Sequence, residues 1–488
     1  MENTADTEKT ATLPVSPEAP EIYRSERSAV IKGATLKYTA EAGFMPISSD
    51  KGERLGKFFY VAYKKTGDEG ARPRPISFIF NGGPGSASLM LHIDCLGPRT
   101  VDLGGGLEIA SAPYRLIDNQ ETLLQISDLV FIDPIGTGYS KGESSEDTAK
   151  TFWGVESDAK SVCSFIRLYL TRNKLHMSPV YIVGESYGGI RAGEMAAYLQ
   201  DVGIQPTGLV LVSPALSYQE LIGAIGNDRP YVHTLPTMTN SAWYHKKLPQ
   251  RLLSMSQEDA YQEAKAWAGE EYLSALWRGN ELDGGEKRAI AEKHASYSGL
   301  SVDEILQLDL RVPLEYFAGN LLRDRRAFLG VYDTRCVTSG GAHCFEEDPS
   351  LFRAQLPAVS ALMSVLTEEI GIVLDEEYMF SNKDIHPTWD FTTGVPKNNG
   401  RGGGYASSMA ELSRSLRRNG QVKLMMVAGN YDLMCNRESS LYSLNHLDIP
   451  PDVRKKLIVK SYDGGHMFYT NPEAKKQFFR DLEAFYEE

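Results

Sequence analysis

The stretch Pro179-Val180-Tyr181-Ile182-Val183-Gly184-Glu185-Ser186-Tyr187-Gly188 decides the fold of this chain. Residues 180–183 are β-branched or aromatic, which predicts a strand, and residues 189–199 read as a helix. A serine at such a junction, with a glycine two positions away on each side, is the pattern of a nucleophile elbow. The tight turn lifts the serine hydroxyl out of the sheet, and a side chain at either glycine would crowd the turn.

The five-residue pattern alone is weak, because the glycine content gives roughly 0.3 chance matches in a chain of this length. An ordinary glycine-rich turn is the alternative. A serine nucleophile also needs an imidazole base, which a carboxylate must orient. Asp432 follows a predicted strand that starts at Val422, and His466 follows another at residues 456–459. The order Ser, Asp, His is that of the α/β-hydrolases, and both candidates lie past strand ends, where open α/β sheets carry their sites.

Further motifs are spaced along the chain: Asn81-Gly82-Gly83-Pro84-Gly85-Ser86-Ala87-Ser88, Leu96-Gly97-Pro98, Asp133-Pro134-Ile135-Gly136-Thr137-Gly138-Tyr139-Ser140, Phe152-Trp153-Gly154-Val155, Asp432 with Cys435-Asn436, and Gly464-Gly465-His466-Met467. With these motifs the chain resembles the serine carboxypeptidases of peptidase family S10, and specifically their bacterial branch. The resemblance runs from about Thr35 to near the C-terminus. It implies an α/β-hydrolase fold with a mainly parallel central sheet covered by helices and an inserted helical cap. It also implies a serine-type carboxypeptidase that releases C-terminal residues from peptides through an acyl-enzyme.

The resemblance assigns a role to each matching residue of the reaction centre. Ser186 matches the nucleophile, Asp432 the orienting acid and His466 the base. The backbone N–H groups of Gly83 and Tyr187 match the oxyanion hole. A glycine-rich loop after a strand at residues 76–80 suits this role, because its backbone can approach the developing oxyanion closely.

The resemblance also implies a site for the C-terminal carboxylate of the substrate, formed by one asparagine and two glutamic acids. Asn81 and Glu185 match the asparagine and one glutamic acid. The other glutamic acid falls on Cys95, and its neighbour Asp94 points elsewhere in an extended or helical chain. Two carboxyls facing a carboxylate must share protons, so the loss of one predicts peptidase activity that extends towards neutral pH.

Four segments are expected along the chain. Residues 1–30 read as a flexible N-terminal tail, residues 31–217 as the first part of the hydrolase core, residues 218–400 as a mainly helical cap insertion, and residues 401–488 as the second part of the core. Candidates for the substrate-facing wall of the cap are Tyr218, Tyr231, Trp243, Tyr244 and Trp389, and Gly400-Arg401-Gly402-Gly403-Gly404 is the candidate return hinge.

Composition limits the partners of this chain of 488 residues. A net charge of −13 argues against nonspecific nucleic-acid binding. No apolar run approaches the roughly 20 residues of a membrane span, and the first residues resemble no secretory signal. We therefore expect a peptide substrate, no nucleic acid, no membrane and a cytoplasmic location. The oligomeric state is not readable, and a homodimer is one form consistent with the sequence.

The five cysteines are Cys95, Cys163, Cys336, Cys344 and Cys435. Their odd number and low density are unlike a disulfide framework, although Cys336 and Cys344 could pair locally. These two and His343 lack the close Cys-x-x-Cys spacing of a metal site. We therefore expect no metal and no cofactor.

Two rival functions stay open. An acyl-enzyme can be intercepted by an alcohol or amine as readily as by water, so an acyltransferase or esterase could use the same scaffold. A catalytically inactive binding module is the second rival, and the presence of Ser186, Asp432 and His466 argues against it.

Overall fold

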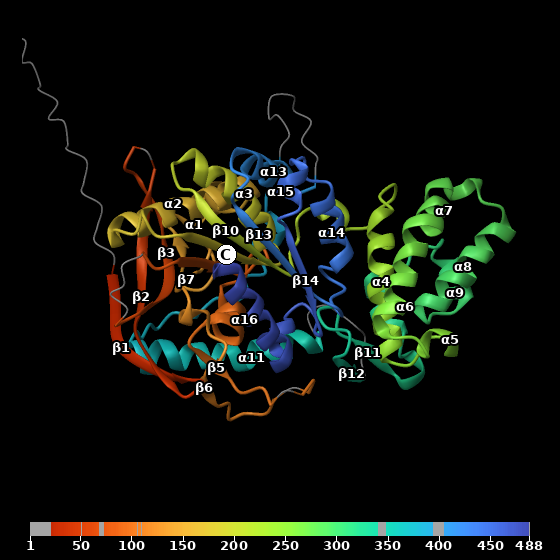
Figure 1. The fold of residues 1–488 in the computed structure, drawn as a ribbon, viewed down its shortest axis with the longest axis horizontal. Helices are drawn as coiled ribbons and strands as arrows, with labels where there is room; N and C mark the ends of the chain where they lie inside the picture. The colour runs from red at the N-terminus through yellow and green to blue at the C-terminus, as the bar shows by residue number, and fades with distance from the viewer. Residues whose placement is uncertain are drawn as a thin grey trace, which may run out of the picture.

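The computed structural model describes residues 21–49, 51–67, 73–104, 106–108, 110–339, 348–393 and 405–487. Its centre is a ten-stranded sheet in the order β1-β2-β3-β7-β4-β9-β10-β13-β14, with β8 paired to β3 (Figure 1). The strands of this sheet are β1 (Glu21–Ile31), β2 (Ala34–Ser48), β3 (Arg54–Lys65), β4 (Ile76–Phe80), β7 (Asp128–Ile132), β8 (Lys141–Gly142), β9 (Val180–Glu185), β10 (Pro206–Val212), β13 (Lys423–Gly429) and β14 (Ile458–Tyr462).

The sheet is parallel from β7 through β4, β9, β10 and β13 to β14. The strands β1, β2 and β3 form an antiparallel extension, and β3 joins β7 in antiparallel register. Every residue of β4 and β9 is buried, as expected for parallel strands covered on both faces. The predicted fold class, a mainly parallel α/β-hydrolase sheet surrounded by helices, is confirmed.

Neighbouring residues of one strand pack into two separate cores, because successive side chains point to opposite faces of the sheet. Phe78 and Phe80 pack with the helices α2 (Val155–Asn173), α3 (Gly188–Asp201) and α13 (Met409–Arg418). Ile79 packs on the other face with α11 (Pro349–Ser364) and α16 (Pro472–Glu487). Figure 1 shows α2, α3 and α13 on one side of the sheet and α11 and α16 on the other.

A mainly helical insertion follows β10 and forms its own hydrophobic cluster, which includes Leu235, Trp267 and Phe317. Figure 1 shows its first helices, in green, beside the core rather than over the sheet. The helices of the insertion are α4 (Arg229–Tyr244), α5 (Gln250–Leu253), α6 (Gln257–Trp267), α7 (Leu273–Arg278), α8 (Gly284–Ser298), α9 (Val302–Gln307), α10 (Leu314–Asn320), α11 and α12 (Ile385–Thr388).

The remaining helices are α1 (Ser145–Phe152), α14 (Arg437–Asn445) and α15 (Pro451–Arg454), and the short strands outside the central sheet are β5 (Arg99–Val101), β6 (Leu116–Asp118), β11 (Ala327–Leu329) and β12 (Val337–Ser339). The pair β11–β12 lies inside the segment that was predicted to be mainly helical.

The segment boundaries at 218 and 400 stay predictions. The structure adds that α11 lies between these limits but packs in the core, since Ala354, Ala358 and Leu362 belong to the cluster under the sheet. The expected hinge at residues 400–404 lies outside the described residues.

The predicted N-terminal tail, residues 1–30, is wrong for its last ten residues, which form a strand. Residues 1–20 lie outside the described part, but from Glu21 the chain forms the edge strand β1, paired with β2. Most β1 side chains are exposed or half-buried, so the strand has little of the apolar pattern that a sequence reading depends on.

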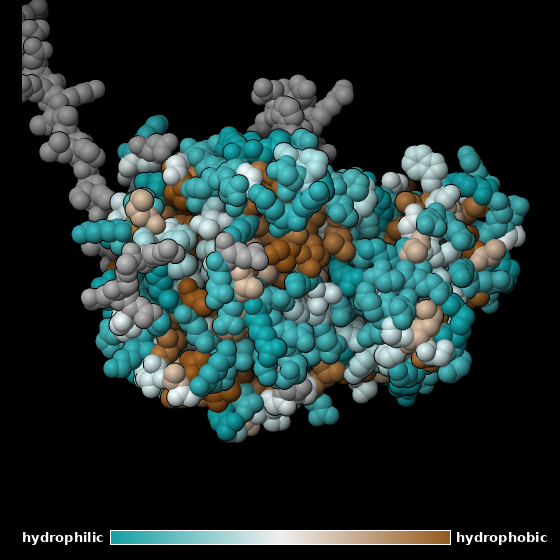
Figure 2. All heavy atoms as spheres, in the orientation of Figure 1, coloured by the Kyte–Doolittle hydropathy of each residue, from teal (hydrophilic) through white to brown (hydrophobic). Residues whose placement is uncertain are grey.

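The surface view in Figure 2 is mostly hydrophilic, with apolar atoms gathered near the middle of the face. Within the described residues, no helix is long and apolar enough to cross a membrane.

Candidate active site

Ser186 occupies the tight turn between β9 and α3. It has a φ of +60°, a left-handed conformation that costs a non-glycine residue of order 1 kcal/mol. The Ser186 N–H donates to the Val212 carbonyl of the neighbouring strand at 3.0 Å, which anchors the turn to the sheet. A Cβ at Gly184 would lie 2.2 Å from the Gly188 carbonyl oxygen, so the turn requires glycine there. The turn leaves the Ser186 side chain partly exposed.

Asp432 and His466 meet beyond the ends of β13 and β14. His466 Nδ1 and Asp432 Oδ2 are 2.7 Å apart, and Asp432 is completely buried. The Cys435 N–H donates to the other Asp432 oxygen at 2.9 Å, which fixes the carboxylate. Burial is the largest single effect and lowers the pKa of His466, but the charge and hydrogen bond of Asp432 together with the charge of Glu185 outweigh it, so the net pKa is raised. The pair is therefore arranged to hold an imidazole in one orientation and to stabilise its protonated form.

Ser186 lines a cleft of about 570 Å³ between the core and the insertion. Its hydroxyl is within hydrogen-bonding reach of the Cys435 thiol. Tyr332, another residue of the cleft wall, contacts the His466 ring at a centroid distance of 5.3 Å, which places the imidazole beside the same cleft. Within the part of the chain that the structure describes, no hydrogen bond joins Ser186 Oγ to His466. Such catalytic bonds often tighten only when substrate binds.

Gly83 and Tyr187, the predicted oxyanion-hole residues, line this cleft together with Ser186. The loop after β4 approaches the elbow so closely that a Cβ at Gly82 would lie 2.4 Å from the Tyr187 nitrogen. The structure thus brings the two predicted backbone donors to the same cleft as the serine, as an oxyanion hole requires.

Asn81 and Glu185, the predicted carboxylate-binding residues, are hydrogen-bonded to each other through the Asn81 amide. Glu185 is only 2% exposed, and burial raises its pKa to about 7. The Tyr469 hydroxyl is 2.9 Å from both Glu185 carboxylate oxygens. Tyr469 is a site residue that the sequence reasoning missed. Its position three residues after His466 was the available signal.

Cys95 lies in the short helical segment η1 (Met90–Leu96), is 1% exposed and does not line the cleft. Its neighbour Asp94 is also buried, and neither of its oxygens has a hydrogen-bond partner within the described residues. Burial raises the pKa of Asp94 to about 7. The position expected to hold a second substrate-facing carboxyl therefore packs a thiol into the core.

Two of the expected wall aromatics, Tyr218 and Tyr231, line the cleft, and the structure adds Tyr332. Trp389 instead packs edge-on against Tyr187 at a centroid distance of 5.4 Å. The other residues of the cleft wall are mainly apolar and include Leu221, Ile222, Pro230, Val312, Pro313, Leu314 and Met434.

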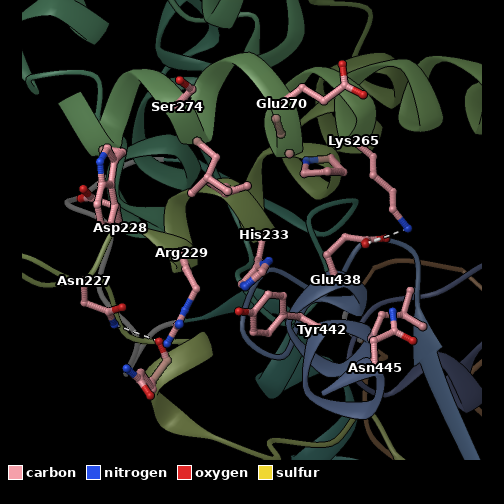
Figure 3. A pocket seen from close by; sticks show the side chains of 18 of the residues that line it. Asn227, Asp228, Arg229, His233, Lys265, Glu270, Ser274, Glu438, Tyr442 and Asn445 are labelled. Carbon is pink, nitrogen blue, oxygen red and sulfur yellow. Dashed lines mark hydrogen bonds and ion pairs between the residues drawn. The ribbon is translucent and has the colours of Figure 1, made fainter. Parts of the chain in front are cut away.

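A second cavity, of about 820 Å³, lies between α4, α7 and α14 (Figure 3). Its cations are paired: Arg229 bonds Glu220 and Lys265 bonds Glu438, both at 2.9 Å. None of the residues predicted for catalysis lines this cavity.

The fold and these contacts define the class of the protein: an α/β-hydrolase with a serine on a strained elbow and an Asp–His pair at adjacent strand ends. The family model described as serine carboxypeptidase matches residues 32–209. That range holds Ser186, Glu185, Asn81 and Gly83 but ends before Asp432 and His466. Over residues 32–209 the chain is therefore similar to the serine carboxypeptidases.

Curated relatives support the same family. A probable serine carboxypeptidase of Arthroderma benhamiae is 26% identical over 201 residues, which cover 35% of this chain and 34% of the relative. Serine carboxypeptidase-like 51 of Arabidopsis thaliana is 32% identical over 124 residues, covering 24% and 23%. The chain thus matches only about a third or less of these relatives' own length.

The likeness in fold extends much further. The crystal structure of KEX1(delta)p, a prohormone-processing carboxypeptidase from Saccharomyces cerevisiae, has a TM-score of 0.58 and 17% identity. The alignment covers 92% of this chain and 91% of that one, and at this identity it shows the fold alone.

Proposed function

We propose that this protein is a serine-type carboxypeptidase that releases C-terminal residues from peptides through an acyl-enzyme on Ser186. The observation that carries the proposal is the 2.7 Å contact between His466 and Asp432 beside the cleft that holds the strained Ser186. The match of residues 32–209 to the serine carboxypeptidase model supports the choice of substrate class.

Each group then has a defined role in the reaction. Ser186 Oγ attacks the scissile carbonyl while His466 Nε2 takes its proton, and Asp432 holds the imidazole by Nδ1. The N–H groups of Gly83 and Tyr187 stabilise the oxyanion. His466 gives the proton to the leaving amine, and water then hydrolyses the acyl-enzyme by the same steps.

Asn81 and Glu185 supply the preference for a free C-terminus. Asn81 donates through its amide, and Glu185 donates to the substrate carboxylate when it is protonated. A pKa of about 7 keeps a large fraction of Glu185 protonated up to neutral pH. We therefore expect the peptidase activity to extend towards neutral pH, without a second carboxyl at Cys95.

An esterase or acyltransferase on the same scaffold is the second candidate. The observations that favour it are the buried Cys95 where a carboxyl was expected and the 2% exposure of Glu185. An enzyme whose carboxylate site is closed would not distinguish a free C-terminus from a blocked one.

Steady-state kinetics on three substrate types test the proposal. The substrates are N-blocked dipeptides with a free C-terminus, the same dipeptides with an amidated C-terminus, and simple esters, each with Ser186→Ala as the blank. A carboxypeptidase has a kcat/KM at least about tenfold higher for the free acid, since one lost charged hydrogen bond is worth that much. Equal values for acid and amide, with faster ester turnover, would favour the esterase.

The finer assignments stay proposals. The bacterial branch is supported by the motifs around Asn81 and Ser186, while the relatives found are fungal and plant proteins. A cytoplasmic location is likewise a proposal that rests on the sequence alone.

A further inference from the structure

Glu185 is held by two donors that come from opposite sides of the reaction centre. Asn81, in the loop after β4, donates its amide to one carboxylate oxygen. Tyr469, in the helical turn η10 (Phe468–Thr470) after His466, lies 2.9 Å from both oxygens. Tyr469 is 1% exposed, so its hydroxyl has no access to bulk water and points into the protein. A buried carboxyl needs such donors, because without them its desolvation is uncompensated.

Tyr469 also borders the place where a second carboxyl was expected. After burial itself, Glu185, Cys95 and Asp94 raise the pKa of Tyr469, and Asp94 and Tyr469 line the same small cavity. Cys95 is a weak donor and is buried, and no hydrogen bond from it to Glu185 is found in the described part of the chain. The phenol is therefore the group that Glu185 meets on this side.

We propose that Tyr469 is a positioning residue for the carboxypeptidase reaction: its hydroxyl holds the Glu185 carboxyl and sets the pH range in which Glu185 can donate to the substrate carboxylate. The inference rests on the proposed function, in which Glu185 meets the C-terminus of the substrate. It adds the group that controls this contact.

Several other groups act on the charge of Glu185. His466, after β14, favours the ionised form, and Asp432, after β13, disfavours it. Asp94 and Cys95 on η1 also interact electrostatically with Glu185. The buried Lys475 on α16 offsets the charges of Asp94 and Cys95. These groups stay in place when only the Tyr469 hydroxyl is removed, so the change at Glu185 can be assigned to that hydroxyl.

The sign of the effect follows from what the hydroxyl stabilises. An O–H donor favours the ionised carboxylate, so it lowers the pKa of Glu185 against the larger effect of burial. Tyr469→Phe keeps the ring and removes the donor, which raises the pKa of Glu185. The alkaline limb of kcat/KM for a free-acid dipeptide, where protonated Glu185 is lost, should move up by about one pH unit.

The experiment measures kcat/KM against pH for Tyr469→Phe on the N-blocked dipeptide acid and on its amide. The amide carries no carboxylate for Glu185 to bind. The limbs of its pH profile therefore report only the enzyme groups that act on both substrates, His466 above all. Tyr60→Phe is the matched control, because the buried Tyr60 donates to the Glu41 carboxylate at 2.7 Å three strands away from β9. It should leave both profiles unmoved.

An upward shift of the acid substrate's alkaline limb in Tyr469→Phe, absent with the amide and in Tyr60→Phe, supports the proposal. An unmoved limb, or an equal shift with both substrates, overturns it. Melting temperature and fluorophosphonate labelling of Ser186 check the fold. If Tyr469→Phe does not fold, Tyr469→Met removes the same donor with a flexible apolar side chain. The same shifts of the alkaline limb then support or overturn the proposal.

Glu185→Met, which removes every hydrogen-bond donor and acceptor oxygen of this side chain, separates failure of this inference from failure of the proposed function. If it keeps the preference for the free acid while Ser186 is still labelled, Glu185 does not bind the substrate carboxylate, and the carboxylate site of the proposed function is wrong. If it loses that preference and the Tyr469→Phe limb is unmoved, the proposed function stands and only the role of Tyr469 is overturned.

Discussion

The proposed reaction centre around Ser186 combines groups that the sequence separates by hundreds of positions. Asp432 and His466 were identified from their order along the chain and their places after strands, and the structure brings them within 2.7 Å. Tyr469 was missed because its position three residues after His466 does not show which group its hydroxyl contacts. Its role depends on a hydrogen bond to Glu185, which only the packing of η10 against β9 creates.

Ser186→Ala should abolish covalent labelling by a fluorophosphonate and lower turnover by roughly 10⁵-fold or more, because it removes the nucleophile. The strained φ of +60° marks this position as built for a hydroxyl at the elbow. Labelling is measured by mass spectrometry of the intact protein. Labelling that persists in the mutant would assign the nucleophile to another residue.

Asp432→Asn should keep the fold but lower turnover by about 10⁴-fold, since an amide favours the wrong imidazole tautomer. Asp463 is the matched control, because it is exposed and pairs with Arg335 at 3.2 Å instead of with His466. Asp463→Asn should retain near-normal kinetics. Normal turnover in a folded Asp432→Asn protein would place the acid elsewhere.

Cys95→Glu separates the two interpretations of this position. A glutamate here would shift the kcat/KM profile towards acid if the position faced the substrate, and would destabilise the fold if the position is part of the core. Cys95 is 1% exposed and its neighbour Asp94 is already a buried carboxyl. We therefore expect Cys95→Glu to lower the free energy of unfolding by about 3 kcal/mol. Thermal unfolding measures this loss of stability, with Cys95→Ser as the control variant. A stable Cys95→Glu protein with an acid-shifted profile would show that position 95 faces the substrate.

At the scale of elements, apolar pattern predicted the parallel strands but not the edges. The strand expected at residues 76–80 coincides with β4, since all its residues are apolar or small and are buried. The sequence predicts a tail at β1 instead of a strand, because β1 is polar and is stabilised mainly by backbone pairing with β2. The last strand was expected at 456–459 but β14 spans Ile458–Tyr462, because its half-exposed residues define no clear boundary.

Gly184→Ala should prevent the β9–α3 junction from forming. Its Cβ would lie 2.2 Å from the Gly188 carbonyl oxygen, a backbone atom that cannot move without breaking the elbow. We expect the free energy of unfolding to fall by about 3 kcal/mol or more. The labelling of Ser186 should be lost as well. Gly269→Ala is the control, because nothing lies within 4 Å of its added Cβ. A Gly184→Ala protein with normal melting temperature and labelling would show that the turn does not need glycine.

At the scale of the whole molecule, the sheet order explains how the site is assembled. The strands β4, β9, β10, β13 and β14 are consecutive neighbours in the sheet, so the loops after them meet at one edge. These loops carry Gly83, Ser186, Asp432 and His466. The insertion after β10 then closes the cleft with Tyr231 and Val312. The motifs predicted this assembly, but the return of α11 to the core could not be read from an isolated amphipathic helix.

Mass spectrometry of peptide products shows whether Ser186 cleaves single residues from a free C-terminus. A peptide of about ten residues is incubated with the enzyme in its acid and amidated forms, with Ser186→Ala as the blank. We expect stepwise loss of single residues from the C-terminus of the acid, none from the blank, and slow or no loss from the amide. Internal cleavage, or an intact acid peptide beside rapid ester hydrolysis by the same enzyme, would contradict it.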